Sequence, residues 1–289
     1  MFGRFWEAST MLPDHPRGPE LSRRTLLRGG VVLAGAAVLG AGPTGTAHAG
    51  SYSRIGTGGY AVPTTLRTGF TPYDGGSIGT HSGEWAFVYD DWFHLLCDSW
   101  LETYHSILRW QTAGAVGVWF VGCAGVTVDK PGSNHQTGNA FDATAIYHTD
   151  GGFVDCNYSH LGRAGVAANR RYAALAWSGR KHLPEVGIVG TGAAHANHVH
   201  LGRFKNGSTS LLLSHWGRSW DAWLVQYTCR AFLGVPIALD GDWGSQTEGW
   251  FLELLRRLGL AGRNPFGSVA DLQQLAHLLT AYGVVGATP

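Results

Sequence analysis

Two short histidine-rich segments, far apart in the chain, constrain its fold more than any other feature. Residues 133–142 read Ser-Asn-His-Gln-Thr-Gly-Asn-Ala-Phe-Asp, and residues 195–200 read His-Ala-Asn-His-Val-His. Together the segments hold four imidazoles and one carboxylate. A fold that uses these groups jointly must bring the two segments side by side, so we expect them to lie on neighbouring strands.

The second segment predicts a strand that carries two imidazoles on one face. Alternate residues of a strand share a face. His198 and His200 therefore point the same way, while Val199 and Leu201 point into the core.

The first segment predicts a turn followed by a strand. Around Asp142, alternation sets Ala140, Asp142 and Thr144 on one face and Phe141, Ala143 and Ala145 on the other. Gly138 suits a turn that folds His135 back beside Asp142, because glycine accepts a positive φ without strain.

Two imidazoles and one carboxylate with an open fourth position are typical of a hydrolytic zinc site. A closed structural site would need four ligands, usually including thiolates. The alternative is that these histidines are surface or hydrogen-bonded core residues. Their grouping with a carboxylate favours the metal site. The remaining histidines show no such pattern and are expected to be structural; among them are His81, His94, His105, His148, His160 and His182.

The pattern of apolar residues predicts an α+β fold with a small antiparallel sheet and flanking helices. A helix after Asp90 and Asp91 buries residues at three- and four-residue spacing, namely Phe93, Cys97, Trp100, Tyr104, Ile107 and Leu108. We expect a second helix over 169–177, closed by Gly179. Strands are expected over 116–121, 139–146, 187–190 and 198–201, without the rhythm of βαβ units.

The N-terminal segment is similar to a bacterial twin-arginine export signal. Arg23 and Arg24 precede an apolar run over 29–42, and Ala47 and Ala49 offer a cleavage site. The run is too short to span a bilayer, so we expect residues 1–49 to be removed and the mature protein to be secreted, with no membrane span. An oxidising exterior favours disulfides among the four cysteines, Cys97, Cys123, Cys156 and Cys229.

Residues 50–210 are expected to form the main domain, with an N-terminal arm over 50–85, and residues 216–289 a small helical domain. Three amphipathic stretches in the latter predict three short helices. The net charge of the chain is +1, with 21 basic and 20 acidic residues, so the broad cationic field that drives nucleic-acid binding is missing. We expect a monomer that binds no nucleic acid.

The pattern S-x-H-x-x-G-x-A-x-D followed by H-x-x-H-x-H resembles the extensin-like C-terminal proteins of bacteria. These belong with the zinc D-Ala-D-Ala carboxypeptidases and murein endopeptidases, whose zinc core is shared with lysostaphin-type enzymes and hedgehog. The resemblance implies that His135, Asp142 and His200 bind Zn²⁺. It also implies that His198 is the general base for the attacking water and that His195 stabilises or positions the oxyanion or the scissile amide.

Two positions depart from the family pattern. Carboxypeptidases of this group carry a glutamate two to three residues before the last histidine ligand, where this chain has Asn197 and His198. This favours the endopeptidase-like arrangement and leaves the scissile bond open. Asn197 also replaces an aspartate that helps to orient an imidazole.

The C-terminal segment resembles the three-helix peptidoglycan-binding module. Its signature is a helix with Leu-Gln followed by D-G-x-[FW]-G-x-x-T, which is similar to residues 240–247 here. We therefore expect a secreted zinc peptidase that cleaves amide bonds in peptidoglycan stem peptides or cross-links. The alternatives are a D-Ala-D-Ala carboxypeptidase and a non-catalytic wall-binding protein whose zinc site is vestigial.

Overall fold

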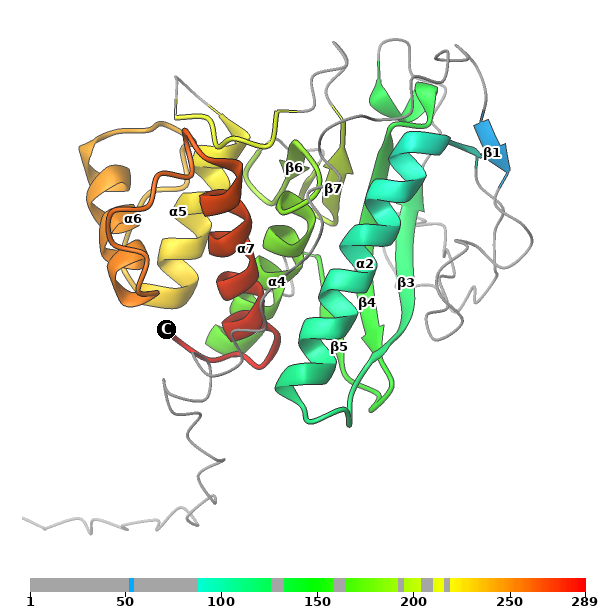
Figure 1. The fold of residues 1–289 in the computed structure, drawn as a ribbon, viewed down its shortest axis with the longest axis horizontal. Helices are drawn as coiled ribbons and strands as arrows, with labels where there is room; N and C mark the ends of the chain where they lie inside the picture. Colours follow the sequence, from blue (N-terminus) through cyan, green and yellow to red (C-terminus); the bar gives the residue numbers. More distant parts are fainter. Residues whose placement is uncertain are drawn as a thin grey trace, which may run out of the picture. The chain divides into compact units, whose positions relative to one another are not determined.

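The computed structural model describes residues 52–54, 88–125, 133–157, 165–191, 195–203, 210–215 and 219–289 and contains a five-stranded antiparallel sheet (Figure 1). Its strands follow the order β3-β4-β7-β6, and β5 also pairs with β4. They span Val118–Gly125 (β3), Ala140–His148 (β4), Phe153–Asp155 (β5), Glu185–Gly187 (β6) and Val199–Gly202 (β7). The predicted α+β fold with a small antiparallel sheet is confirmed.

The pairing of β4 with β7 joins the two histidine-rich segments. Asp142 of β4 lies opposite His200 of β7, and Gly187 of β6 faces His200 from the other side. Leu201 and Phe141 turn to the opposite face and are buried, as the alternation predicts. The register therefore places the polar side chains of both segments on the sheet face away from this core.

Helices α2 (Asp91–Gln111) and α4 (Gly165–Arg180) cover the apolar face of the sheet (Figure 1). Trp100 of α2 packs on Phe141 of β4, with ring centroids 5.8 Å apart. The predicted apolar face of α2 is confirmed, since all of its members are buried: Phe93, Cys97, Trp100, Tyr104, Ile107 and Leu108. Before α2, β1 (Tyr52–Arg54) pairs with β2 (Val88–Asp90).

Gly179 does not close the second helix as predicted, because α4 continues through it to Arg180. A Cβ atom at Gly179 would lie 2.5 Å from Cδ2 of Leu201. The glycine therefore allows α4 to approach β7 closely. The strand expected over 187–190 is also corrected, because β6 covers Glu185–Gly187 and Gly190 has a positive φ of 96°.

Three further helices follow the sheet, as predicted: α5 (Trp220–Leu233), α6 (Ser245–Arg257) and α7 (Val269–Val284). They share one hydrophobic core with the rest of residues 50–289, because α7 packs on both α4 and α2, and α5 packs on α4. Arg180 at the end of α4 is 1% exposed and bonds to Asp221 of α5. The two predicted domains are thus in extensive contact.

The backbone at Asp240 and Gly241 is bound by a side chain of α5. Gly241 has a φ of 76°, and its N–H and that of Asp240 donate to Oε1 of Gln226 on α5. The Gln226 amide donates in turn to Asp240 Oδ1 and to Thr247 Oγ1 of α6. The buried Gln226 therefore ties α5 to the start of α6 through these contacts.

Two of the four cysteines give no support to the expected disulfides. Cys156 and Cys229 are buried thiols, and burial raises the pKa of Cys229 to about 12. Cys229 serves as core packing on α5. Pairings through the side chain of Cys123 lie outside the described residues.

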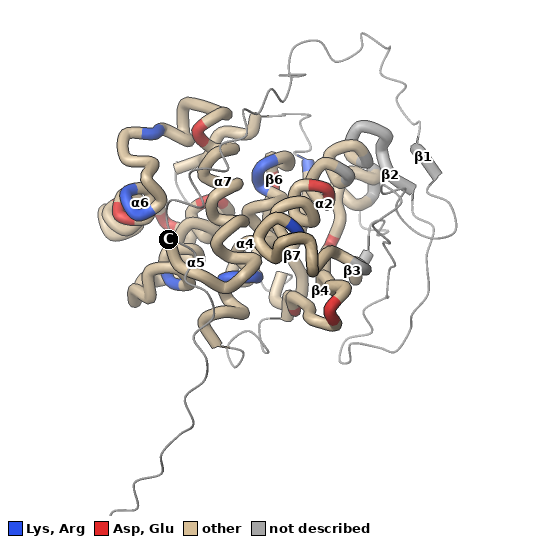
Figure 2. The backbone as a smooth tube through the Cα atoms, turned by 60° about the horizontal axis from the view of Figure 1, so that its bottom comes forward, with Lys and Arg blue, Asp and Glu red and all other residues tan. Residues whose placement is uncertain are grey.

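Charged residues are sparse and of both signs along the described chain (Figure 2). Within the described part, no helix is long and apolar enough to cross a bilayer. The predicted export signal over 1–49 and all of the predicted arm over 50–85 except β1 lie outside the described residues.

Candidate metal centre

His135 reaches the site from a short 3-10 helix, η1 (Asn134–Thr137), that precedes β4. The Ser133 hydroxyl accepts from the His135 N–H, and Gly138 ends the helix with a φ of 70°. The backbone N–H of Gly138 donates to the His135 carbonyl at 3.1 Å. The predicted role of Gly138 is confirmed: its left-handed backbone turns the chain so that His135 lies beside Asp142.

Asp142 is the centre of the cluster, because its carboxylate faces three imidazoles. Oδ2 lies 3.2 Å from Nε2 of His135, and Oδ1 lies 2.9 Å from Nδ1 of His200. Oδ1 is also 3.4 Å from Nε2 of His198. The side chains of these four residues are at most 14% exposed. The structure therefore brings the two predicted segments together around one carboxylate.

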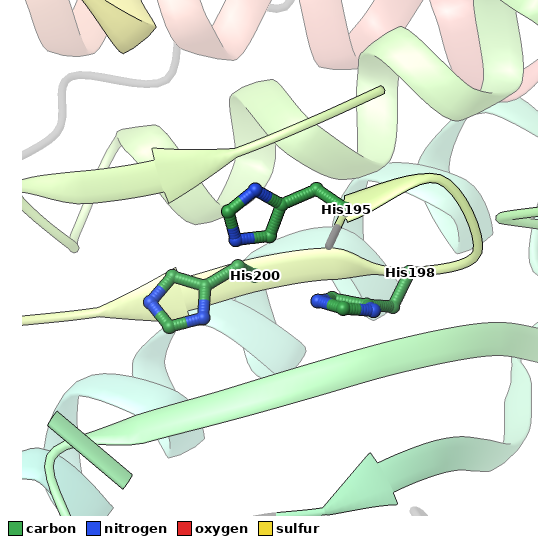
Figure 3. Close-up of side chains that lie close together, drawn as sticks. All are labelled: His195, His198 and His200. Atoms are coloured by element: carbon green, nitrogen blue, oxygen red, sulfur yellow. The ribbon is translucent and has the colours of Figure 1, made fainter. Parts of the chain in front are cut away.

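His195 completes the group from the loop before β7 (Figure 3). Its ring centroid lies 5.2 Å from that of His198 and 5.4 Å from that of His200. The Thr191 hydroxyl is 3.0 Å from His195 Nδ1. All five predicted site residues thus lie in one cluster.

Asn197 takes the position where the family that the motifs resemble has an aspartate, and it contacts the following imidazole. Its Oδ1 lies 2.8 Å from Nδ1 of His198. This contact orients the His198 ring so that Nε2 points toward Asp142. An amide oxygen accepts a hydrogen bond as an aspartate does, although it carries no charge to stabilise an imidazolium.

The surroundings of the cluster favour an ionised Asp142 and neutral His195 and His198. Burial alone would raise the pKa of Asp142, but hydrogen bonds with His135 and His200 outweigh it and hold the pKa well below its ordinary value. Burial, together with the neighbouring His200 and His198, lowers the pKa of His195 to about 4. Burial also lowers the pKa of His198, although Asp142 opposes this.

Two groups of donor atoms in the cluster could hold a metal ion. His135, Asp142 and His200 each offer one ligand atom, and these atoms lie within 4.8 Å of one another. A second set, formed by His195, His198 and His200, meets the same criterion. Among described residues, no group bonds to the buried Nε2 of His200, whose Nδ1 faces Asp142. Two nitrogens and an oxygen in a buried cluster fit a divalent ion such as Zn²⁺.

Three further residues support the cluster and were not predicted from the sequence. Glu185 of β6 accepts a 2.7 Å hydrogen bond from Asn134, the neighbour of His135. Thr191 contacts His195, and Trp220 of α5 packs against His195 and His200. The Asn134 side chain stands next to a candidate ligand, which is a local signal, but its partner Glu185 lies far along the chain.

Histidines outside the cluster have structural contacts, as expected. Nδ1 of His105 accepts from the Val118 N–H, and His182 contacts the Thr103 hydroxyl at 2.8 Å. His148 contacts the Tyr104 hydroxyl at 3.3 Å. The side chains of His81, His94 and His160 lie outside the described residues.

Comparison with known proteins adds no relative. No family model, no curated protein and no solved structure matches the chain. The chemistry of the cluster therefore carries the functional argument.

Proposed function

We propose that the protein is a zinc peptidase in which His135, Asp142 and His200 bind the metal. The observation that carries the proposal is the contact of one buried carboxylate with imidazoles from two distant segments, with two further neutral imidazoles beside it. A purely structural metal site would not need His195 and His198 next to the ligands. A hydrolytic site needs a base within reach of the attacking water.

A zinc ion held by these ligands would lower the pKa of a bound water and polarise a carbonyl. His198 is the general base: its neutral Nε2 faces the ligand carboxylate, and Asn197 contacts Nδ1. His198 would accept the water proton and return it to the leaving amine. His195, held at Nδ1 by Thr191, stabilises or positions the scissile amide.

The same set of two histidines and one carboxylate also binds iron(II) in oxygenases. His195 and His198 favour hydrolysis here, because they add groups that move protons and orient an amide. Metal analysis of the protein as purified would distinguish the two ions.

The proposed substrate is the peptide part of cell-wall peptidoglycan. Support comes from the resemblance of the metal motifs to extensin-like proteins and murein endopeptidases, and of residues 240–247 to the peptidoglycan-binding module. Under this proposal the sheet and its helices form a hedgehog-type peptidase core. The twin-arginine-like segment supports secretion, and the mature protein acts as a monomer.

Peptidoglycan digestion followed by mass spectrometry tests the proposal. We expect new amine termini within cross-links, which indicate an endopeptidase. Loss of terminal D-Ala alone would indicate the carboxypeptidase alternative, in which the fold and metal site are the same. Unchanged peptidoglycan, with less than about half a metal ion per chain, would leave the non-catalytic wall-binding protein.

A further inference from the structure

Trp220, the first residue of α5, packs against the histidine cluster of the candidate metal centre. Its ring centroid is 5.0 Å from that of His195 and 5.5 Å from that of His200, with interplanar angles of 73° and 85°. Such edge-to-face contacts are favourable and fix the planes of both rings. A residue of the C-terminal helices therefore forms part of the wall of the site.

The packing between Trp220 and the two histidines leaves no space at Gly187. A Cβ atom there would lie 3.2 Å from Cζ3 of Trp220, 3.3 Å from Nε2 of His195 and 3.2 Å from Cβ of His200. These distances are shorter than ordinary van der Waals contact. The side chains of Trp220, His195 and His200 thus pack against the backbone of β6 at Gly187.

Trp220 is held by the residues on both sides of it. The Ser219 hydroxyl caps α5 by accepting from the Ala222 N–H and donates to the Ser214 carbonyl. The Asp221 carboxylate accepts two hydrogen bonds from Arg180, at 2.7 and 3.2 Å, and one from the Ser214 N–H. The start of α5 is therefore fixed to the end of α4.

Arg180 uses all of its guanidinium nitrogens in this junction. Besides Asp221, it donates to three carbonyl oxygens, those of Leu183, Leu211 and Leu212. The guanidinium group is planar and its donors are fixed in direction, so this set of partners determines the orientation of the first turn of α5. Asp221 of this ion pair follows Trp220 directly in sequence, so the ion pair acts on Trp220 through that turn.

We propose that Trp220 is a positioning residue of the metal site and that the Arg180–Asp221 ion pair sets its place. This inference rests on the metal-binding function proposed above. His195 is held at Nδ1 by Thr191, and Trp220 fixes the plane of the same ring, so that Nε2 points to the space beside His200. Figure 3 shows how close the rings of His195, His198 and His200 lie. Without the indole, both His195 and His200 gain rotational freedom.

The test compares Trp220→Leu, Trp220→Phe and Asp221→Asn with the wild type, all as full-length mature protein. Trp110→Leu is the matched control, because Trp110 is 47% exposed on α2. Three readouts are used: histidine ring-proton NMR shifts of the metal-free protein, zinc affinity by chelator competition, and the visible spectrum of the Co²⁺-substituted protein.

We expect Trp220→Leu to shift the ring-proton signals of His195 and His200, to weaken zinc binding about tenfold and to change the Co²⁺ spectrum. Trp220→Phe should restore most of the affinity, because it keeps an aromatic edge. Asp221→Asn should weaken zinc binding less than Trp220→Leu, and Trp110→Leu should change none of the readouts. Thermal unfolding of each variant separates a local effect from a loss of fold.

If the wild type binds metal, two results for Trp220→Leu would each overturn the inference. One is a set of histidine NMR shifts that match those of the wild type. The other is a zinc affinity and a Co²⁺ spectrum that match those of the wild type. A wild-type protein that binds no metal would instead overturn the proposed function, and the role of Trp220 with it. If Trp220→Leu does not fold, Trp220→Phe and Asp221→Asn decide by the same readouts: wild-type values in both would contradict the inference.

Discussion

At the scale of single residues, the site depends on the contrast between one ionised carboxylate and its neutral neighbours. The pKa of Asp142 lies well below its ordinary value, so the carboxylate is charged at every pH at which the protein would work. His195 and His198 have lowered pKa values and are neutral near pH 7. Under the proposed function, the metal ligand Asp142 and the proton acceptor His198 would thus both be in the required state before a substrate arrives.

His198→Ala should keep the metal and lose turnover. The proposed function assigns this imidazole the role of base, so its removal should lower kcat about 10²- to 10⁴-fold. Metal content by mass spectrometry and release of amine termini from peptidoglycan check this. His135→Ala is the comparison variant, and it should lose metal and activity together. Loss of metal from His198→Ala alone would show that ligand and base have been exchanged.

At the scale of elements, Gly179 lets α4 approach β7, the strand that carries His200. Gly179 lets the helix contact Leu201, which is buried on the strand that carries His200. A larger residue at this point would push the strand away from the helix. His200 would then move relative to Asp142, because His200 lies on β7 and Asp142 on the neighbouring strand β4.

Gly179→Ala should destabilise the protein although alanine favours helices. The new Cβ atom would lie 2.5 Å from Leu201, and such overpacking costs about 1–3 kcal/mol. Gly249→Ala on α6 is the matched control, since nothing lies within 4 Å of its Cβ position. It should raise the free energy of unfolding by about 0.5–1 kcal/mol. Urea unfolding of both variants tests the difference in sign; equal effects would contradict the packing argument.

Local patterns in the sequence predict most of the elements and the site residues, because alternation and helical spacing are short-range properties. The strand through His200 and the apolar face of α2 follow from such patterns. The roles of Arg180, Trp220 and Gly179 do not, because each depends on a partner in another element. The pairing of elements in space is decided by packing across the whole chain.

At the scale of the whole molecule, several buried histidines make stability depend on pH. Burial and Lys181 lower the pKa of His182 to about 4, and burial also lowers the pKa values of His148 and His277. Between the unfolded pKa near 6.5 and the folded value, only the unfolded chain takes up the proton. Stability is therefore full above pH 6.5 and falls as the pH is lowered.

Unfolding free energy should fall between pH 7 and pH 5, with His182 contributing at most about 1.4 kcal/mol per pH unit below its unfolded pKa. Urea unfolding at a series of pH values measures this. His182→Gln removes the titrating group and should make the curve shallower. The prediction fails if the wild type and the variant show the same dependence on pH.

A chain truncated before residue 216 should not fold cooperatively. Helix α7 packs on α4, where Trp177 and Ala173 are fully buried, and the removal of α5–α7 would expose this apolar surface. Soluble yield and thermal unfolding of residues 50–215 test the expectation. A sharp transition close to that of the full mature chain would instead show that residues 216–289 are a separable module.

The packing of α7 on α4 and α2 also bears on when the fold is completed during synthesis. The strands and histidines of the candidate metal centre leave the ribosome well before α7 does. Until α7 has been made, one side of α4 has no cover, and α4 is also the helix on which α5, the helix of Trp220, packs. Under the proposed function, the site would then become competent late, after translation of nearly the whole chain, and growing polypeptides on the ribosome would carry an unfinished site.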